Sequence, residues 1–351
     1  MSEQRFSHHQ LTRFAEGVYR AYGLPEADAA LVADSLVQAE LWGHASHGML
    51  RTFWYGTRLK SGAIQARTEL ETVMDGGAMA VMDGHNGVGQ VIAARAMESA
   101  INRARQHGVG LVSVRNSGHF GTAMYFTRMA VKAGCIGLLS TNSSPAMAPW
   151  GGYEKRVGAN PWSIAAPAGK FPPMVLDIGN TAVARGKLHV ARRKGEAIPA
   201  GWATDAQGRP TLDPAEGIAG NILPIGGHKG YGIALMMDVL SGVLSGSGFG
   251  TGVVGPFVPE GSSGAGQLVM ALHVPAFRPM PEFCGDMERL IGQIKSSPLA
   301  PGNDEILYPG EPEARAEDIA RREGIALPAE TVAELDTGAR ELEVKPLSEM
   351  A

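Results

Sequence analysis

Residues 79–114 read MAVMDGHNGVGQVIAARAMESAINRARQHGVGLVSV, and this stretch decides the fold class. The apolar run 79–82 predicts a short strand that ends in the turn Asp83-Gly84. A helix is expected from about residue 88 to 106, and the β-rich run 110–114 predicts a second strand. A strand–helix–strand unit of this kind is the building block of α/β proteins.

The sequence that follows extends this α/β pattern. A helix is predicted over 123–133 and a strand over 135–140. The segment 191–222 is polar and rich in turns, which is typical of an excursion over the surface. The remaining predicted elements are strands at 163–166, 174–178 and 268–273 and a long apolar helix at 231–244.

Both ends of the chain have helical periodicity. Ser7 with Gln10 predicts a capping box for the first helix, which ends at Gly23, and Pro25 suits the start of a second helix that runs to about residue 43. Two amphipathic helices are predicted near the C-terminus, over 313–322 and 328–342. We therefore expect a helical domain made from residues 1–72 and 313–351, and an α/β domain over 73–312.

Composition excludes several classes of protein. Hydrophobic residues make up 44% and charged residues 19%, as in ordinary globular proteins, and the net charge of −4 gives no electrostatic reason to expect nucleic acid or a membrane as partner. The opening residues MSEQRFSHHQ lack the apolar segment of a signal peptide, and no apolar run reaches the roughly 18 residues of a membrane span. Cys135 and Cys284 are expected to be buried thiols rather than a disulfide or metal pair. A cytoplasmic enzyme is the expectation.

The glycine-rich stretches do not predict an ordinary Rossmann site. GTGVVG at 250–255 matches the dinucleotide pattern, but it follows SGSG at 245–248 rather than a strand, and no helix follows it. The glycines of 83–89 do lie between a strand and a helix. However, Ile92 stands at the third glycine's place and no acidic residue follows the next strand at 115–116. A nicotinamide cofactor would have to bind in another way.

The segment SHGMLR (46–51) contains the residue types that chemistry on a 2-hydroxy acid needs. If it is helical, His47 and Arg51 share one face. The planar fork of arginine suits a carboxylate, and histidine titrates near neutral pH. On its own the pair is also typical of a solvated helix face. His44 and His47 lack a third ligand at a sensible spacing, so no metal is predicted.

Two further segments place polar groups at the ends of secondary structure. NSGHFGT (116–122) follows a strand and precedes a helix, so His119 stands where α/β proteins place ligands, and Thr122 is positioned to hold a phosphate. IGGHKGYG (225–232) sets Lys229 among glycines at a helix start, which is typical of an anion site. Ordinary turn packing accounts for either segment equally well.

Together these segments resemble the malate/L-lactate dehydrogenase family of non-Rossmann type. Its relatives include sulfolactate and ureidoglycolate dehydrogenases, 2,3-diketo-L-gulonate reductase and Δ1-piperideine-2-carboxylate reductase. The resemblance covers nearly the whole chain and is specific for fold and reaction class. The matching stretches, in order, are SHGMLR (46–51), DGHNGVGQ (83–90), NSGHFGTAMYF (116–126), TNSSPAMAPWGG (141–152), GANPWSIAAP (158–167), VLDIGNTAVARGK (175–187), GGHKGYG (226–232) and LYPGEPE (307–313).

The resemblance implies a non-Rossmann α/β fold, in which helices from both termini accompany a mixed-sheet domain that holds NAD or NADP. It implies a homodimer with the site near the subunit interface and a small carboxylic acid as substrate. It also implies residue roles. Arg51, with Lys229, would bind the substrate, Ser46 would orient His47, and His47 and His119 would be the acid/base candidates. The residues expected along the cofactor are His119, Phe120, Gly121, Thr122, Ser140, Asn142, Asp177, Ile178, Gly179, Lys229, Pro309, Gly310 and Glu311.

Rival functions remain open at this stage. A reductase of a 2-oxo sugar acid, ureidoglycolate or a cyclic imino acid would use the same chemistry. The imino-acid branch is disfavoured, because the basic run at 192–194 stands where that branch is expected to have an aspartate. A non-enzymatic acid-binding protein would not need two histidines beside Arg51. A hydrolase is disfavoured because no nucleophile-elbow sequence surrounds Ser117.

Overall fold

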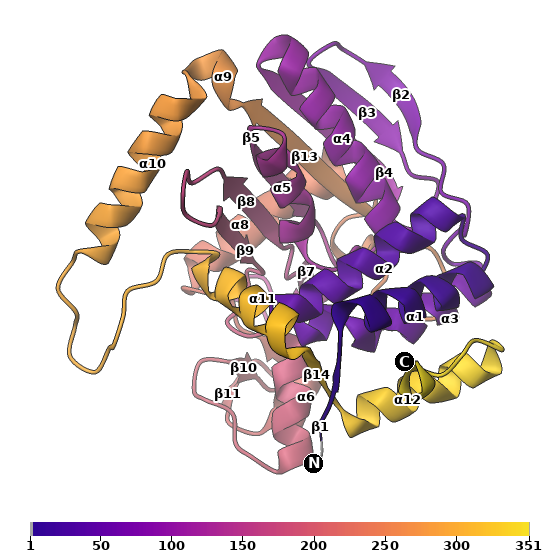
Figure 1. The fold of residues 1–351 in the computed structure, drawn as a ribbon. Coiled ribbons are helices and arrows are strands. Elements are labelled where there is room, and N and C mark those ends of the chain that lie inside the picture. The colour runs from indigo at the N-terminus through magenta and orange to yellow at the C-terminus, as the bar shows by residue number, and fades with distance from the viewer. Residues whose placement is uncertain (1–2, 351) are drawn as a thin grey trace.

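The computed structural model describes residues 3–350, and at its centre lies a seven-stranded sheet (Figure 1). The strand order is β2-β3-β4-β13-β5-β8-β9. Strands β3 and β4 are parallel, and every other neighbouring pair in this sheet is antiparallel. This mixed sheet confirms the predicted fold class. The strands span Glu71–Asp75 (β2), Met79–Asp83 (β3), Val109–Ser117 (β4), Cys135–Thr141 (β5), Trp162–Ala166 (β8), Met174–Ile178 (β9) and Ala265–His273 (β13).

The predicted strand–helix–strand unit is present as β3, α4 (Gly89–His107) and β4. Helix α4 ends at Gly108, whose φ of 83° is the left-handed conformation that favours glycine at a helix end. Helices α4 and α5 (Ala123–Lys132) lie on the same face of the sheet (Figure 1). Their buried side chains, among them Ile92 and Phe126, pack on the strands, so this face of the sheet is closed.

Helices from both ends of the chain form a second layer. It comprises α1 (His8–Ala21), α2 (Glu26–Leu41), α3 (Thr52–Lys60), α11 (Glu311–Glu323) and α12 (Ala329–Glu341). The predicted capping box of Ser7 and Gln10 is confirmed. Strand β1 (Glu3–Phe6) pairs antiparallel with β14 (Ile325–Pro328), which joins the two termini. Leu11, Phe14 and Leu36 share one core with Leu335 and Leu347, so the two ends are packed together.

The opposite face of the sheet carries α8 (His228–Asp238), which continues into a π-helical turn, Val239–Val243. The inward side is small and polar where it meets the sheet, and Ser241 is fully buried. The outward side is apolar and exposed. Its exposed side chains are Ile233, Leu235, Met236, Val239, Val243 and Leu244.

The segment 191–222 is more ordered than its polar composition predicted. It contains the end of α6 (Arg185–Lys194), helix α7 (Pro214–Ala219) and a small sheet in the order β11-β10-β12. These elements surround a core of their own that includes Leu188, Ile198 and Ile222. A few apolar residues spaced through a polar segment were enough to organise it. The strands are Ala203–Thr204 (β10), Pro210–Thr211 (β11) and Asn221–Ile222 (β12).

Helices α9 (Val274–Phe277) and α10 (Met280–Lys295), like α6 and α7, were not anticipated from the sequence. Helices α9 and α10 extend away from the sheet at the left of Figure 1. Ile291 is the residue of α10 that is buried, in a cluster with Ala168 and Tyr308. The apolar residues Phe283, Met287, Ile291 and Ile294 have helical spacing, so the signal for this helix was present in the sequence and was overlooked.

Three smaller features bear on the expectations from the sequence. GTGVVG at 250–255 forms a 3₁₀ turn, Gly250–Gly252, and a loop, without the strand–turn–helix context of a dinucleotide site. Cys135 is buried, Cys284 is half-buried, and neither forms a disulfide. Within residues 3–350, none of the helices combines the length and apolar character needed to cross a bilayer. The remaining strands, β6 (Pro145–Met147) and β7 (Val157–Gly158), pair with each other.

Candidate active site

The SHGMLR segment is not one helix, as the four-residue spacing had suggested. It forms two 3₁₀ turns, Ala45–His47 and Met49–Arg51, divided at Gly48. The carboxylate of Glu40 accepts the Met49 N–H at 2.7 Å, so this N–H cannot continue a helix. Glu40 also fills the space beside Gly48, where an added Cβ would lie 2.2 Å from its Oε1. A buried carboxylate thus turns the chain between the histidine and the arginine.

Arg51 is held in place but keeps hydrogen-bonding capacity. Its Nε donates to the Ser46 carbonyl at 2.7 Å, and its guanidinium stacks on the Trp54 ring, 3.9 Å from the ring centre. Phe257 lies beside it, with its ring centre 5.4 Å away. Within residues 3–350, the buried Nη1 has no hydrogen-bond partner. A buried guanidinium nitrogen without a partner is costly, and a carboxylate is the group that would satisfy it best.

His119 is fixed by two donors on the same ring nitrogen. The Tyr55 hydroxyl lies 2.5 Å from Nδ1, and the Gly121 N–H donates to Nδ1 at 3.3 Å. Because a backbone N–H can only donate, Nδ1 accepts and the proton of the neutral ring lies on Nε2. Burial raises the pKa of Tyr55, which keeps its hydroxyl protonated. His119 therefore presents an N–H donor at Nε2.

His47 and His119 form a stacked pair. Their ring centres are 5.8 Å apart and the planes differ by 16°. Burial, with the charge of Arg51 and the neighbouring His44, lowers the pKa of His47 to about 4. Burial and the same arginine lower the pKa of His119 well below its ordinary value. Both imidazoles are neutral at pH 7, and the Ser46 hydroxyl lies 2.9 Å from His47 Nδ1.

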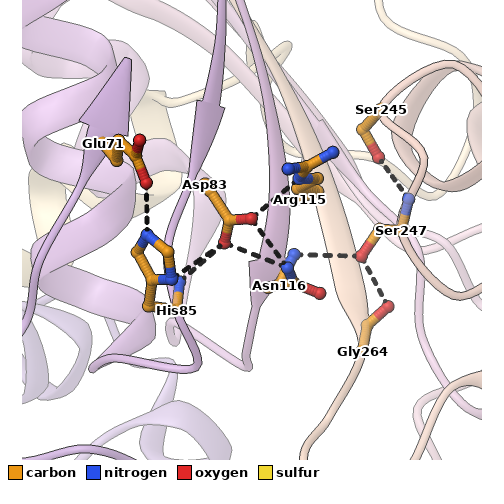
Figure 2. Close-up of polar contacts among 8 residues, drawn as sticks. All are labelled: Glu71, Asp83, His85, Arg115, Asn116, Ser245, Ser247 and Gly264. Atoms are coloured by element: carbon orange, nitrogen blue, oxygen red, sulfur yellow. Dashed lines mark hydrogen bonds and ion pairs between the residues drawn. The ribbon is translucent and has the colours of Figure 1, made fainter. Parts of the chain in front are cut away.

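The strand end that precedes His119 is braced by a polar network, which Figure 2 shows. Asp83 accepts hydrogen bonds from the Asn116 amide at 3.0 Å and from Arg115 Nε at 2.8 Å. Asn116 has a φ of 54°, in the left-handed region, and donates its N–H to Ser247 Oγ at 3.1 Å. Ser247 in turn donates to the Gly264 carbonyl at 2.8 Å. The turn after β3, the His119 loop and the chain before β13 are thus tied together.

The His119 loop also packs tightly against the start of α4. A Cβ added at Gly89 would lie 2.4 Å from the His119 carbonyl oxygen and 2.7 Å from that of Gly118. This close approach explains the glycine at the beginning of α4. In the DGHNGVG turn, Gly89 therefore allows the chain to pack against the loop of His119, a catalytic candidate, and is not explained by binding of a pyrophosphate.

The residues predicted to hold the cofactor begin at the end of this loop. Thr122 precedes α5 at the N-cap position but caps no backbone N–H, and its buried Oγ1 has no partner in the described part of the chain. Asp177, near the end of β9, accepts the Met124 N–H from the first turn of α5 at 2.8 Å. Burial raises the pKa of Asp177 to about 6. The unpartnered Thr122 hydroxyl at a helix N-terminus fits a phosphate or ribose oxygen.

Ser140 and Asn142 are buried, and the chain itself satisfies their side chains. Ser140 Oγ lies 3.0 Å from Ser241 Oγ. Asn142 donates to Asp238 at 2.8 Å and to the Gly248 carbonyl at 2.7 Å. Its side-chain oxygen accepts the Gly266 N–H. These two residues join β5 to α8 and the strand β13.

The LYPGEPE stretch lies against β9. The Pro309 carbonyl accepts the Val175 N–H at 2.9 Å, and Gly310, with a φ of 93°, leaves no room for a Cβ beside Val175. Glu311 forms ion pairs of 2.7 Å with Lys295 and Arg315. Burial opposes ionisation of Glu311, but these cations outweigh it and keep its pKa below the ordinary value. The LYPGEPE stretch is thereby fixed against Val175, two residues before Asp177 on β9.

Lys229 is exposed on the first turn of α8. The neighbouring His228 packs edge-on against Trp150, with ring centres 5.7 Å apart. Within residues 3–350, no hydrogen bond or ion pair joins Lys229 to His47 or His119. Ile178 is the last residue of β9 and Gly179 follows it, and Phe120 is buried beneath the loop against Phe126.

Sequence reasoning missed several residues at this site. Tyr55 stands four residues after Arg51 on a continuous helical segment, and that spacing was a usable signal. Trp54, next to it, was equally within reach. Phe257 comes from a loop about 200 residues away in the chain, which Arg58 of α3 holds, and no local sequence pattern predicts these contacts.

The fold and the site define an α/β protein with two neutral histidines beside an arginine suited to bind a carboxylate. These are the groups that an enzyme acting on a small acid requires. The family model described as malate/L-lactate dehydrogenase matches residues 6–336. The malate dehydrogenase of Pyrococcus abyssi is 40% identical over 346 residues, which cover 96% of this chain and 95% of that protein. The L-sulfolactate dehydrogenase of Methanocaldococcus jannaschii is 43% identical over 310 residues, covering 88% and 89%. A solved structure of sulfolactate dehydrogenase from that organism superposes with a TM-score of 0.93 at 39% identity, covering 99% of each chain. The chain belongs to the malate/L-lactate dehydrogenase family.

Proposed function

We propose that this protein is an NAD(P)-dependent oxidoreductase that transfers a hydride between the nicotinamide and C2 of a small 2-hydroxy or 2-oxo acid of the malate, lactate or sulfolactate type. The observation that carries the proposal is the unpartnered, buried Nη1 of Arg51 beside the stacked neutral pair of His47 and His119. The names of the relatives support the same reaction class.

Arg51 binds the substrate carboxylate. Its guanidinium is oriented by the Ser46 carbonyl and the Trp54 ring, so little conformational entropy is lost when the acid binds. A bidentate contact on the remaining nitrogens fixes C2 relative to the histidines. The second cation proposed from the sequence, Lys229, lies exposed at the start of α8, where it suits a negative group at the rim of the site.

The two histidines have different roles. His119 donates its Nε2–H to the C2 oxygen and polarises the carbonyl, since its Nδ1 is already occupied by two donors. His47 accepts the hydroxyl proton when the acid is oxidised and returns it when the oxo acid is reduced, with Ser46 orienting its ring. A low pKa keeps His47 unprotonated and ready to accept.

The cofactor supplies the hydride acceptor and donor at its nicotinamide ring. The residues proposed to hold it are the loop from His119 to Thr122, Ser140, Asn142, Asp177 to Gly179, Lys229 and Pro309 to Glu311. Thr122 Oγ1 supports this placement because it is buried, unpartnered and located at a helix N-terminus. Relatives carry both cofactors in their names: NAD(+) for the ureidoglycolate dehydrogenase of Escherichia coli and NADP(+) for a sulfolactate dehydrogenase of Chromohalobacter salexigens.

We further propose a cytoplasmic homodimer. Composition supports the location, and the exposed apolar side of α8 and its π-helical turn supports association between two copies. An isologous pairing through this surface would bury the same side chains of both chains.

The experiment that tests the proposed function follows the absorbance of NADH and NADPH at 340 nm against a panel of 2-oxo acids that includes oxaloacetate, pyruvate, sulfopyruvate and 2,3-diketogulonate. Turnover with at least one acid is expected. His47→Ala and His119→Ala should each lower kcat, by at least tenfold on the usual scale of acid/base and electrostatic contributions. Absence of turnover with every acid would refute the proposal, and near-normal kcat in both variants would refute the assignment of the histidines.

A further inference from the structure

Arg58 is a buried cation that the chemistry above does not use. It lies on α3, one turn beyond Trp54, and is 2% exposed. In the described part of the chain it forms no ion pair with a carboxylate. Its guanidinium instead donates to oxygens of one loop: the carbonyls of Gly255, Val258 and Gly261 and the hydroxyl of Ser263.

These contacts fasten the loop 253–263 to α3. Ser61, at the end of the same helix, adds a hydrogen bond of 2.5 Å to the Pro259 carbonyl. The loop closes on itself at its base, where the Val254 N–H donates to the Ser263 carbonyl at 2.9 Å. The end of the GTGVVG stretch belongs to this loop. A sequence that matches a dinucleotide motif therefore forms part of a loop held by Arg58.

The clamp sets one aromatic side chain against the carboxylate-binding arginine. The Phe257 ring packs on Trp54, with ring centres 4.5 Å apart at 59°, and its centre is 5.4 Å from the Arg51 guanidinium carbon. Phe257 is nevertheless 57% exposed. Its outer face is therefore open to a molecule held by Arg51, while its inner face is fixed.

We infer that Phe257, held by Arg58, is a specificity-determining residue: it forms the wall that limits the length of the side chain on C2 of the acid. The inference rests on the proposed function, because it places the acid on Arg51. A substrate whose carboxylate is on Arg51 and whose C2 oxygen faces His119 has its C2 substituent as the remaining group, and the Trp54–Phe257 pair is the apolar surface beside it. The wall comes from a segment that is about 200 residues away in the chain.

The test measures kcat/KM for pyruvate, 2-oxobutyrate and 2-oxovalerate in the wild type, Phe257→Ala and Phe257→Leu. Because one methylene group in a shaped apolar site changes selectivity by about 10- to 200-fold, Phe257→Ala should raise the 2-oxovalerate to pyruvate ratio at least tenfold. Phe257→Leu should give a smaller rise. The change should fall mainly on KM, since the histidines and Arg51 are untouched.

Two further variants distinguish an effect on substrate selectivity from an effect on folding. Arg58→Lys keeps the charge but loses the fork that holds several carbonyls, so it should shift the ratio in the same direction. Phe277→Ala, on α9 and 68% exposed, is the matched control and should leave the ratio unchanged.

An unchanged ratio in folded Phe257→Ala overturns the inference. So does an equal loss of activity on all three acids, which would make Phe257 part of the shared chemistry. If the wild type turns over none of these acids and none of the earlier panel, the proposed function fails instead. If only oxaloacetate or sulfopyruvate is used, the ratio of that acid to its homologue with one more methylene replaces the series.

Discussion

At the scale of single residues, the centre of the site combines two uncharged imidazoles, of His47 and His119, with the charged guanidinium of Arg51. Protonation of His47 is opposed by burial and by Arg51, and protonation of His119 by burial, Arg51 and Arg58, so the pKa of each ring is lowered. Arg51 has a nitrogen with no partner. Such a site gains most from binding an anion, because the anion satisfies the arginine and offsets the charge that develops on a histidine.

Tyr55→Phe tests how much the Tyr55 hydroxyl contributes to holding His119. The variant removes the hydroxyl 2.5 Å from Nδ1 while keeping the ring, so the Gly121 N–H alone fixes the proton on Nε2. We expect kcat to fall about tenfold, the loss of one hydrogen bond of roughly 1.4 kcal/mol, with KM little changed. Steady-state kinetics check this, and a rise in KM without a change in kcat would assign Tyr55 to substrate binding instead.

Glu40 gives a prediction about pH. Burial raises its pKa to about 7 in the folded protein, against about 4.5 in the unfolded chain. Between these two pH values Glu40 holds a proton in the folded state and has released it in the unfolded state. The free energy of unfolding therefore decreases as pH rises through this window. Glu40→Gln keeps the oxygen that accepts the Met49 N–H but cannot ionise.

The Tm of Glu40→Gln relative to wild type should therefore increase from pH 5 to pH 8, by the equivalent of about 3 kcal/mol for a shift of this size. Thermal unfolding at a series of pH values measures it. A Tm difference that stays constant across this range, or decreases, would show that Glu40 is not the titrating group.

At the scale of elements, the site depends on tight contacts between segments rather than on one motif. Asp83 at the end of β3 holds the strand end at Asn116 (Figure 2), and Gly89 at the start of α4 packs against the His119 carbonyl. The turn between α2 and α3 is shaped by Glu40. Each loop is held by a neighbouring element, so the reacting groups are preorganised by backbone contacts.

Gly89→Ala tests this arrangement. The added methyl would lie 2.4 Å from the His119 carbonyl, a backbone atom that can only move together with the loop. We expect a loss of several kcal/mol of stability or a displaced His119, with kcat reduced at least tenfold. Gly292→Ala in α10 is the control. Its Cβ meets nothing within 4 Å, so it should be neutral or stabilise by up to about 1 kcal/mol. Equal effects of the two substitutions in unfolding and activity assays would contradict the role of Gly89.

How far the sequence predicted these elements depended on periodicity. The strand–helix–strand unit, the terminal helices and most strands of the large sheet followed from apolar spacing and caps, because each has a clear buried face. Helix α10 has the same kind of apolar spacing, at Phe283, Met287, Ile291 and Ile294, and could have been predicted, although of these four residues Ile291 is the one that is buried. The predicted helical face of His47 and Arg51 was wrong, because the Glu40 side chain competes for a backbone N–H that the local pattern assigned to a helix. Phe257 was beyond reach, since only the folded chain brings it to Arg51.

At the scale of the whole molecule, the termini and the middle of the chain contribute different parts of one site. Arg51, His47 and Tyr55 come from the N-terminal helical layer, and His119 comes from the sheet. We propose the division into a helical domain, 1–72 with 313–351, and an α/β domain, 73–312, on this basis. Hydrogen bonds such as that from Tyr55 to His119 cross the proposed boundary, so the site is complete only when both parts are folded.

The proposed homodimer leads to a further prediction. Met236→Lys places a charge on the exposed apolar side of α8. The variant should sediment as a single chain, whereas the wild type should sediment at twice that mass, because an unpaired buried charge is strongly unfavourable in an apolar interface. Val73→Lys, exposed on the edge strand β2, is the control and should remain dimeric. A wild type of single-chain mass, or a dimeric Met236→Lys, would rule out this interface.

The central claim is that Arg51 reads the carboxylate of an acid whose C2 is oxidised or reduced, and one comparison tests it most directly. KM and kcat are measured in the wild type and Arg51→Ala for the best 2-oxo acid and for the amide of the same acid. Loss of a charge-assisted contact worth about 1.5–3 kcal/mol predicts a roughly 10- to 150-fold higher KM for the acid in Arg51→Ala. The constants for the amide should be unchanged. Equal losses for acid and amide, or an unaltered KM for the acid, would contradict the account.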